Sequence, residues 1–153
     1  MRKTIYISGP ISDNTTGQPR PDWKPEFNET EKKLLKNGFD VINPVRLSEA
    51  LEAMRGAATL TRADYILHCL ETMNRAHKAG MLHGVLVIGD SVEAIVASCG
   101  VRMEMQLAAA LGIPVFIETV NGLHVTADLK PVKEELWLAP WGDIVRRGAT
   151  KPA

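Results

Sequence analysis

The sequence predicts an α/β fold built on a doubly wound, mainly parallel sheet with helices on both faces. Short apolar segments typical of buried strands alternate with longer segments of helical periodicity, and this alternation favours a parallel sheet. The apolar run Val-Leu-Val-Ile at residues 85–88 is unbroken, as expected of a parallel strand covered on both faces. The chain of 153 residues has the length of a single domain with its own core.

The first part of the chain is predicted to form a strand, a loop, a helix and a second strand. Residues 4–9 are β-branched and aromatic and precede Pro10, which is typical of a buried strand. Residues 12–25 are rich in Ser, Asn, Thr, Gly and Pro and are predicted to form a long loop, a kind of segment that often carries function. We expect a helix over residues 26–38 and a second strand over residues 39–44.

The middle of the chain continues the alternation. A short helix capped by Ser48 is predicted over residues 47–56, and a long helix over residues 59–80. A third strand at residues 82–90 is followed by a loop, a helix and a fourth strand at residues 113–118. This order is that of a flavodoxin-like or Rossmann-like sheet, whose ligands bind at the carboxyl ends of the strands.

Residues 119–153 are predicted to extend the domain that residues 1–118 form. The Asn-Gly pair at residues 121–122 suits a hairpin turn, and one more helix is expected further on. Trp137 and Trp141 are expected to pack on the sheet, with a subunit contact or a cover over the site as the alternatives. The extension is therefore expected to pack on the same domain or at a subunit interface.

Composition narrows the classes of function. Lys plus Arg and Asp plus Glu number 18 each, so we expect no general binding to nucleic acid or to a membrane surface. The N-terminus lacks the apolar segment of a signal peptide, and no apolar run approaches the roughly 20 residues that span a bilayer. Two cysteines make no disulfide framework, and the four histidines lack metal-binding spacing. We expect a cytoplasmic protein with no membrane contact, no metal and no cofactor.

The segment after the third predicted strand contains Ser98, Gly100 and Glu104 in the pattern Ser-x-Gly-x-x-x-Glu. If a helix begins near Gly100, Glu104 lies in its first or second turn, where the helix dipole favours an ionised carboxylate. Gly100 permits close approach of a ligand to the backbone, and Ser98 offers a hydroxyl. From spacing alone, the alternative is a capping serine and an exposed helix glutamate.

Other candidates lie on the first strand and on the long helix. Ser8, Gly9 and Pro10 end the first strand at the same sheet edge, where Gly9 can present N–H groups to a phosphate or sugar, or can be an ordinary strand-end glycine. The ring of Tyr6 is expected in the core, where its hydroxyl needs a partner. Asp64 lies early in the long helix, and a helix-start aspartate or a surface ion pair is the simpler interpretation.

Together these segments resemble the nucleoside 2-deoxyribosyltransferase superfamily. It includes the deoxyribosyltransferases, the 2′-deoxynucleoside 5′-monophosphate N-glycosidases and short uncharacterised domains of phage and prophage genomes, which this sequence resembles most. The resemblance covers about residues 3–118 and rests on IYISGPIS, FNETEKKLLKNGFDVINP, TRAD and SCGVRMEMQLAAALGIPV. It implies cleavage of an N-glycosidic bond, or base exchange, on a nucleoside or nucleoside 5′-monophosphate.

The resemblance also implies a role for each candidate. Glu104 would be the nucleophile that attacks the anomeric carbon and forms a glycosyl-enzyme, which water or a second base then releases. Tyr6 would orient this glutamate, and Asp64 would bind the sugar or act as a general acid. The substrate would be held by Ser8, Gly9, Pro10, Ser98 and Gly100. Related enzymes complete their pockets across an interface, so a homo-oligomer is expected.

Three features differ from the pattern of this superfamily. The monophosphate N-glycosidases carry a basic residue near Ser12, for which Arg20 of the same loop could substitute. His83 stands where many members have aspartate, and the segment GDSVEAIVA at residues 89–97 is longer than usual. Two other functions therefore stay open: a nucleotide-binding or sensor module without turnover, and an assembly protein that retains only the fold. An intact cluster of the glutamate, tyrosine and aspartate would favour the enzyme.

Overall fold

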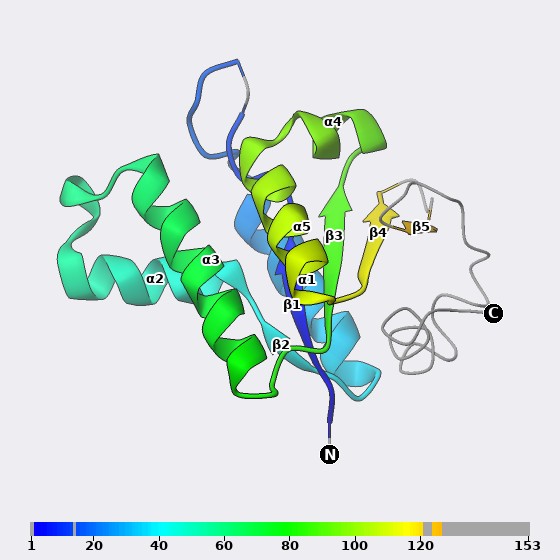
Figure 1. Cartoon of the computed structure of the whole chain (residues 1–153). Helices are drawn as coiled ribbons and strands as arrows, with labels where there is room; N and C mark the ends of the chain where they lie inside the picture. Colours follow the sequence, from blue (N-terminus) through cyan, green and yellow to red (C-terminus); the bar gives the residue numbers. More distant parts are fainter. Residues whose placement is uncertain (1, 14, 121–123, 127–153) are drawn as a thin grey trace.

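A computed structural model of the protein describes residues 2–13, 15–120 and 124–126. The strand order of its sheet is β2-β1-β3-β4-β5, with β5 antiparallel to β4 and the other pairs parallel (Figure 1). This order is flavodoxin-like, which confirms the predicted α/β fold. The strands are β1 (Thr4–Ser8), β2 (Asp40–Ile42), β3 (Gly84–Gly89), β4 (Val115–Thr119) and β5 (His124–Thr126).

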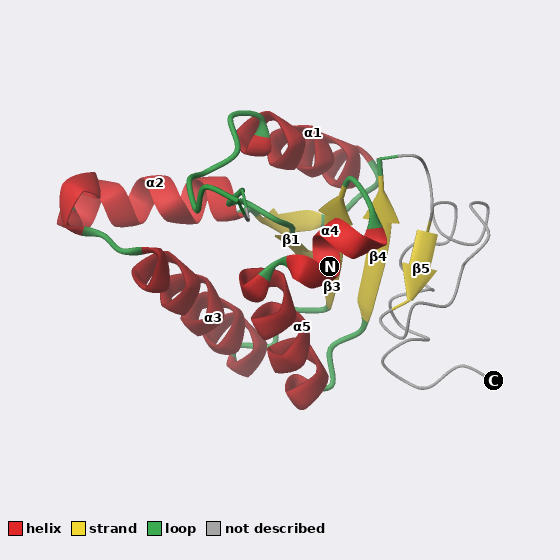
Figure 2. Ribbon diagram, turned by 90° about the horizontal axis from the view of Figure 1, so that it is seen from above, coloured by secondary structure: helices red, strands yellow, loops and turns green. Residues whose placement is uncertain are grey.

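Helices cover both faces of the sheet, as Figure 2 shows from above. Helix α1 lies on one face, α3 and α5 lie on the other, and α2 packs against α1 and α3. A short 3-10 helix, η1, joins α2 to α3. The helices are α1 (Trp23–Lys36), α2 (Pro44–Arg55), η1 (Ala57–Thr59), α3 (Arg62–Lys78), α4 (Val92–Ala97) and α5 (Cys99–Leu111).

The alternation of side chains along β1 divides the core into two layers. Successive residues of a strand face opposite sides of the sheet. Ile5 and Ile7 pack with Phe27 of α1, whereas Tyr6 belongs to the layer that contains Ala108 of α5. All five of these side chains are fully buried. The polar group of Tyr6 is therefore committed to the face that α3 and α5 cover.

Two helices begin earlier than the sequence predicts. Helix α1 begins at Trp23 rather than residue 26, and the Trp23 ring packs edge-on against Phe27 with centroids 5.4 Å apart. Helix α2 is capped by Asn43, whose side chain accepts a hydrogen bond from the Val45 N–H at 3.0 Å, and proline fills its first position. The predicted cap, Ser48, lies inside this helix and donates to the Val45 carbonyl at 2.9 Å.

The segment at residues 89–97, predicted as a loop, contains the short helix α4. Ser91 caps it by accepting a hydrogen bond from a backbone N–H at 3.1 Å. Ile95 packs so close to β3 that a Cβ on Gly89 would lie 2.6 Å from its side chain, which explains glycine at the end of this strand. Helix α4 ends at Ala97, and the next residue, Ser98, is both its C-cap and the N-cap of α5. The long insertion therefore leads directly into α5.

The predicted extension lies mostly outside the described residues. Strand β5 pairs antiparallel with β4, while the turn at 121–122, the further helix, Trp137 and Trp141 fall outside the described part. Among the described residues, no helix combines the length and apolar character needed to cross a membrane. Nor do these residues contain a group of three or more His, Cys, Asp or Glu side chains placed to hold a metal ion.

Candidate functional site

A buried glutamate meets two hydroxyl groups at the carboxyl end of β1. Glu104 of α5 is only 8% exposed. The Ser8 hydroxyl donates to its Oε1 at 2.8 Å, and the Tyr6 hydroxyl donates to its Oε2. A carboxylate that accepts hydrogen bonds through both oxygens cannot rotate freely, so the two hydroxyls of β1 fix its orientation.

The sequence produces this arrangement through two periodicities. Tyr6 and Ser8 are two residues apart on β1, so both side chains face the layer of α3 and α5. Helix α5 starts after its cap, Ser98, and Glu104 falls in its second turn. The predicted position of Glu104 on the helix is thus confirmed, and the alternative of an exposed helix glutamate is wrong.

Burial dominates the electrostatics of this group. It raises the pKa of Glu104 to about 7, although the hydrogen bonds from Tyr6 and Ser8 act in the opposite direction. Burial, followed by the charge of Glu104, raises the pKa of Tyr6 well above its usual value, so its hydroxyl keeps its proton and donates it. Near neutral pH the carboxyl is therefore divided between its neutral and ionised forms.

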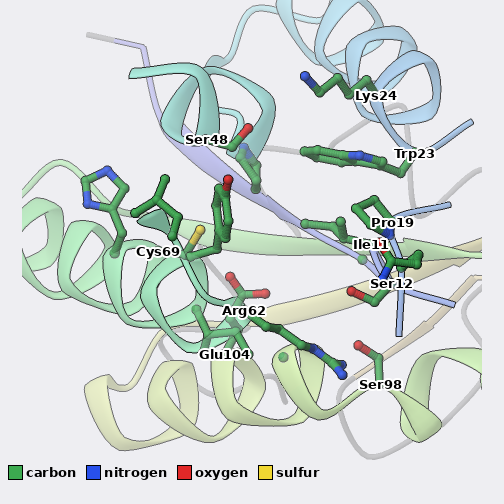
Figure 3. A pocket seen from close by; sticks show the side chains of 18 of the residues that line it. Ile11, Ser12, Pro19, Trp23, Lys24, Ser48, Arg62, Cys69, Ser98 and Glu104 are labelled. Carbon is green, nitrogen blue, oxygen red and sulfur yellow. The ribbon is translucent and has the colours of Figure 1, made fainter. Parts of the chain in front are cut away.

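Glu104 opens into a cavity of about 570 Å³ at the carboxyl ends of β1 and β2, which the start of α5 also lines. This size lies within the range of about 300–1,000 Å³ that is common for small-molecule sites. Figure 3 shows the Glu104 carboxylate pointing into the cavity, with Cys69 on one side and Trp23 across from it. The cavity lies beside the point where the strand order reverses between β1 and β3, where flavodoxin-like folds bind ligands.

The structure separates the predicted substrate-binding residues into two sets. Gly9, Ser98 and Gly100 line the cavity. Ser8 is fully buried behind Glu104 and contacts this carboxylate, and Pro10 is absent from the described lining. Ser8 is thus placed to orient the glutamate rather than to touch a ligand.

The two cavity glycines have different physical explanations. A Cβ on Gly9 would lie 2.8 Å from the Ile88 carbonyl oxygen, so the packing of β1 against β3 already requires glycine there. On Gly100, a Cβ would meet only Ile66, at 3.9 Å, so the backbone tolerates a side chain. Glycine at position 100 instead leaves that wall of the cavity open to a ligand.

Asp64 lies outside the cluster of Tyr6 and Glu104. Its carboxylate accepts hydrogen bonds from the Thr61 N–H at 2.8 Å and the Thr61 hydroxyl at 3.0 Å, in a capping box at the start of α3. These bonds lower the pKa of Asp64. The residues of α3 that line the cavity are Arg62, Tyr65, Ile66, His68 and Cys69, and Asp64 is not among them.

A comparison of the sequence with protein families gives a match that includes the residues of the candidate site. Residues 3–117 match the family described as "Domain of unknown function (DUF4406)", a span that includes β1 and α5. The chain belongs to the DUF4406 family. The comparison with curated proteins gives no match. Since the description of the DUF4406 family assigns no function, the resemblance to the deoxyribosyltransferase superfamily stays a prediction.

Much of the cavity wall in this DUF4406 domain was not predicted from sequence. Trp23 and Lys24 come from the start of α1, and Glu52 of α2 accepts a hydrogen bond from the Tyr65 hydroxyl of α3 at 3.1 Å. Arg62 adds a cation from the first position of α3. The helical spacing of the α3 residues marks one face of that helix, but nothing local in the sequence indicates which partner the face meets.

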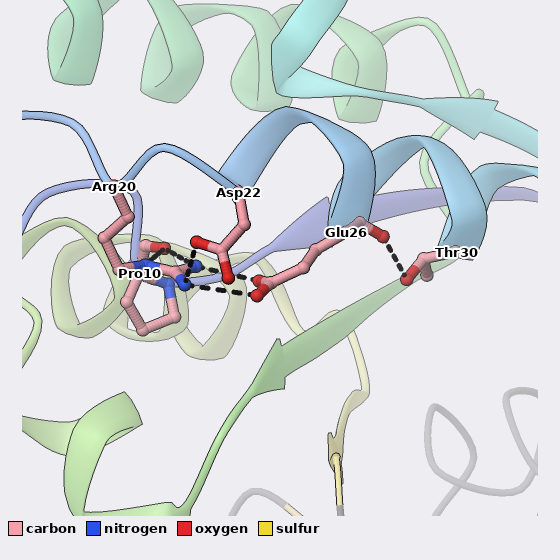
Figure 4. A network of polar contacts seen from close by, with 5 residues as sticks. All are labelled: Pro10, Arg20, Asp22, Glu26 and Thr30. Carbon is pink, nitrogen blue, oxygen red and sulfur yellow. Dashed lines mark hydrogen bonds and ion pairs between the residues drawn. The ribbon is translucent and has the colours of Figure 1, made fainter.

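Arg20 does not take the place of the basic residue that the resemblance implies near Ser12. Its guanidinium donates to the Pro10 carbonyl at 2.7 and 3.1 Å and pairs with Glu26 at 2.8 Å and Asp22 at 3.2 Å (Figure 4). The hydrogen bond with Glu26 is the main cause that raises the pKa of Arg20. Arg20 therefore ties the first loop to α1, while Ser12 of the same loop lines the cavity.

The unusual histidine of the third strand also lies away from the cavity. His83 precedes β3 at its amino end, opposite the end that carries the site. Its Nδ1 accepts a hydrogen bond from the Thr4 N–H at 2.9 Å, and burial lowers its pKa. The departure at this position leaves the cluster around Glu104 untouched.

The two cysteines of the DUF4406 domain are expected to differ in reactivity. Cys69 lines the cavity beside Glu104, and burial, followed by the charge of Glu104, raises its pKa to about 12. Cys99 is exposed. Because the thiolate is the reactive form, a disulfide reagent at neutral pH should modify Cys99 quickly and Cys69 only after unfolding. Counting the thiols that react in the native protein and in Cys99→Ser tests this, and rapid reaction of both would contradict it.

Proposed function

We propose that the protein cleaves the N-glycosidic bond of a nucleoside or nucleoside 5′-monophosphate, by hydrolysis or by transfer to a second base, with Glu104 as the nucleophile. The observation that carries the proposal is the position of the Glu104 carboxylate. It is buried, held by the hydroxyls of Tyr6 and Ser8, and open to a cavity at the ligand-binding edge of the sheet. A merely structural glutamate on this helix would be expected to face water.

The chemistry follows from a carboxylate fixed below a sugar. A carboxylate oxygen of Glu104 attacks C1′ of the sugar, and a carbon–oxygen bond forms as the bond from C1′ to the base nitrogen breaks. The electron pair of the broken bond leaves with the base, which takes up a proton. Water or the nitrogen of a second base then attacks C1′, loses a proton and returns Glu104 to its carboxylate form. The net result is a free base and a free sugar, or an exchanged base.

In this proposal the hydroxyls beneath the carboxylate act as positioning groups. Tyr6 and Ser8 donate to the ionised form of Glu104, which opposes the effect of burial and keeps more of the nucleophile charged. Asp64 is given no part in the reaction, because its carboxylate caps α3. The proton for the leaving base then comes from another donor or from water.

A second candidate is a nucleotide-binding module without turnover. The observation that favours it is the orientation of Asp64, which leaves the cluster without the general acid that the resemblance implies. Both candidates use the same cavity and differ only in whether the glycosidic bond breaks. The homo-oligomer and the cytoplasmic location implied by the sequence remain predictions under either candidate.

The proposal is tested by the release of free base. We expect the protein to release base from at least one member of a panel of ribonucleosides, deoxyribonucleosides and their 5′-monophosphates, as measured by chromatography. Adding a second, isotopically labelled base separates transfer from hydrolysis, because only transfer incorporates the label into nucleoside. If every panel member stays intact while one of them binds by calorimetry, the binding module replaces the enzyme.

A further inference from the structure

Of the acidic and basic side chains that line the cavity, some have hydrogen-bond or ring partners and one does not. Its two carboxylates both accept hydrogen bonds: Glu104 from Tyr6 and Ser8, and Glu52 from the Tyr65 hydroxyl. One of the two Lys or Arg residues in the lining, Lys24, has its ammonium 5.8 Å from the centre of the Trp23 ring. The other, Arg62, has no hydrogen bond or ion pair within the part of the chain that the structure describes.

The backbone around Arg62 is held by a capping box, although the described residues give its side chain no hydrogen bond or ion pair. It follows Thr61, whose side chain and that of Asp64 close the capping box at the start of α3. This box occupies the nearest carboxylate, which also lies 3.8 Å from Arg55. An acid only two residues away is thereby kept from neutralising Arg62.

Arg62 reaches the part of the cavity where Ser98 lies. In Figure 3 its side chain extends from α3 in the direction of Ser98 at the start of α5. Ser98 accepts its capping hydrogen bond from the Val101 N–H at 3.4 Å, which leaves its hydroxyl proton free to donate. An unpaired guanidinium and a hydroxyl donor together suit a planar or tetrahedral oxyanion, which arginine binds with paired hydrogen bonds.

We propose that Arg62 selects a phosphorylated substrate by binding the phosphate monoester of a nucleoside 5′-monophosphate beside Ser98. The inference rests on the proposed function, because it takes the ligand to be a nucleoside whose C1′ faces Glu104. Among the described residues between β1 and α1, Ser12 lines the cavity without charge and Arg20 is held by Pro10 and Glu26. Lys24, at the start of α1, has its ammonium beside the Trp23 ring. In this proposal the charge of the phosphate is neutralised by Arg62 of α3.

The inference is tested by calorimetry on full-length Glu104→Gln protein, in which turnover is blocked. The ligands are the four deoxynucleosides, their 5′-monophosphates, 2-deoxyribose 5-phosphate and inorganic phosphate. We expect a monophosphate to bind at least about tenfold more tightly than its nucleoside, the effect of charge-assisted hydrogen bonds. Arg62→Gln should bring this ratio close to one, and Arg62→Lys should leave part of it.

Arg75→Gln is the matched control, because it removes an exposed arginine from the same helix outside the described lining and should leave the ratio intact. A ratio near one in the parent, a ratio that survives Arg62→Gln, or an absence of binding would each overturn the inference. If inorganic phosphate binds as tightly as the monophosphate, the site recognises free phosphate rather than the phosphate of a nucleotide. Base release by the native protein is measured separately. If base is released but the monophosphate and its nucleoside bind equally well, only this inference is wrong. If the monophosphate binds more tightly but no base is released, only the enzymatic proposal is wrong.

Discussion

Glu104→Gln is expected to reduce base release by about 10³-fold or more, the scale on which enzymes lose activity when a nucleophile is removed. Glutamine has the shape of glutamate but cannot form the ester to C1′. The loss should appear in the rate constant for base release under single-turnover conditions, because the covalent step itself is removed. Binding of the substrate should persist, since the amide still fills the same space in the cavity wall.

The substitution is informative because the fold should survive it. The amide oxygen can accept from Tyr6, and the amide nitrogen can donate to the Ser8 hydroxyl, so neither hydroxyl is left unpaired. Glu71→Gln is a matched control on an exposed site of α3, and we expect it to retain full activity. If Glu104→Gln keeps a tenth or more of the native rate with an unchanged melting temperature, the assignment of Glu104 as nucleophile is wrong.

The strands and the fold were predictable because each leaves a local signal. The apolar run at residues 85–88 needs cover on both faces, and β3 is buried along its whole length. Helix α4 was missed although Ser91 and Ile95 are a usable cap and an apolar anchor, because six residues are too few to establish a helical period. The start of α2 lies before the predicted one because the pair Asn43-Pro44 supplies both a cap and a proline suited to the first turn.

The candidate site was predictable where the position of a residue follows from the periodicity of its own strand or helix. Alternation on β1 gives Tyr6 and Ser8 a common face, and the helix after Ser98 carries Glu104 to it. The pattern Thr61-x-x-Asp64 matches a capping box, which is a local signal that the Asp64 carboxylate is bound to the backbone of α3. The walls, from α1, α2 and α3, depend on how separate elements pack, which no local pattern encodes.

The stability of the native protein is expected to fall as pH rises, by an amount that Glu104→Gln removes. Burial raises the pKa of Glu104 from 4.5 to about 7, so between these values the folded state binds more protons than the unfolded state. Stability therefore decreases as pH rises from about 4.5 to about 7, because ionisation stabilises the unfolded carboxyl while the buried one keeps its proton. Each tenfold change in proton affinity is worth about 1.4 kcal/mol, so the loss amounts to about 3 kcal/mol by pH 8.

The same proton governs activity in the opposite sense. Only the ionised carboxylate attacks C1′, so base release should rise through a midpoint near pH 7, where the fall in the free energy of unfolding that begins near pH 4.5 levels off. Urea unfolding of the native protein and of Glu104→Gln at several pH values isolates the contribution of this group, since all other titrations are shared. Parallel stability curves for the two proteins would mean that Glu104 is already ionised well below neutral pH. A rate midpoint far below pH 7, in a protein whose stability falls as expected up to pH 7, would assign the activity to a different group.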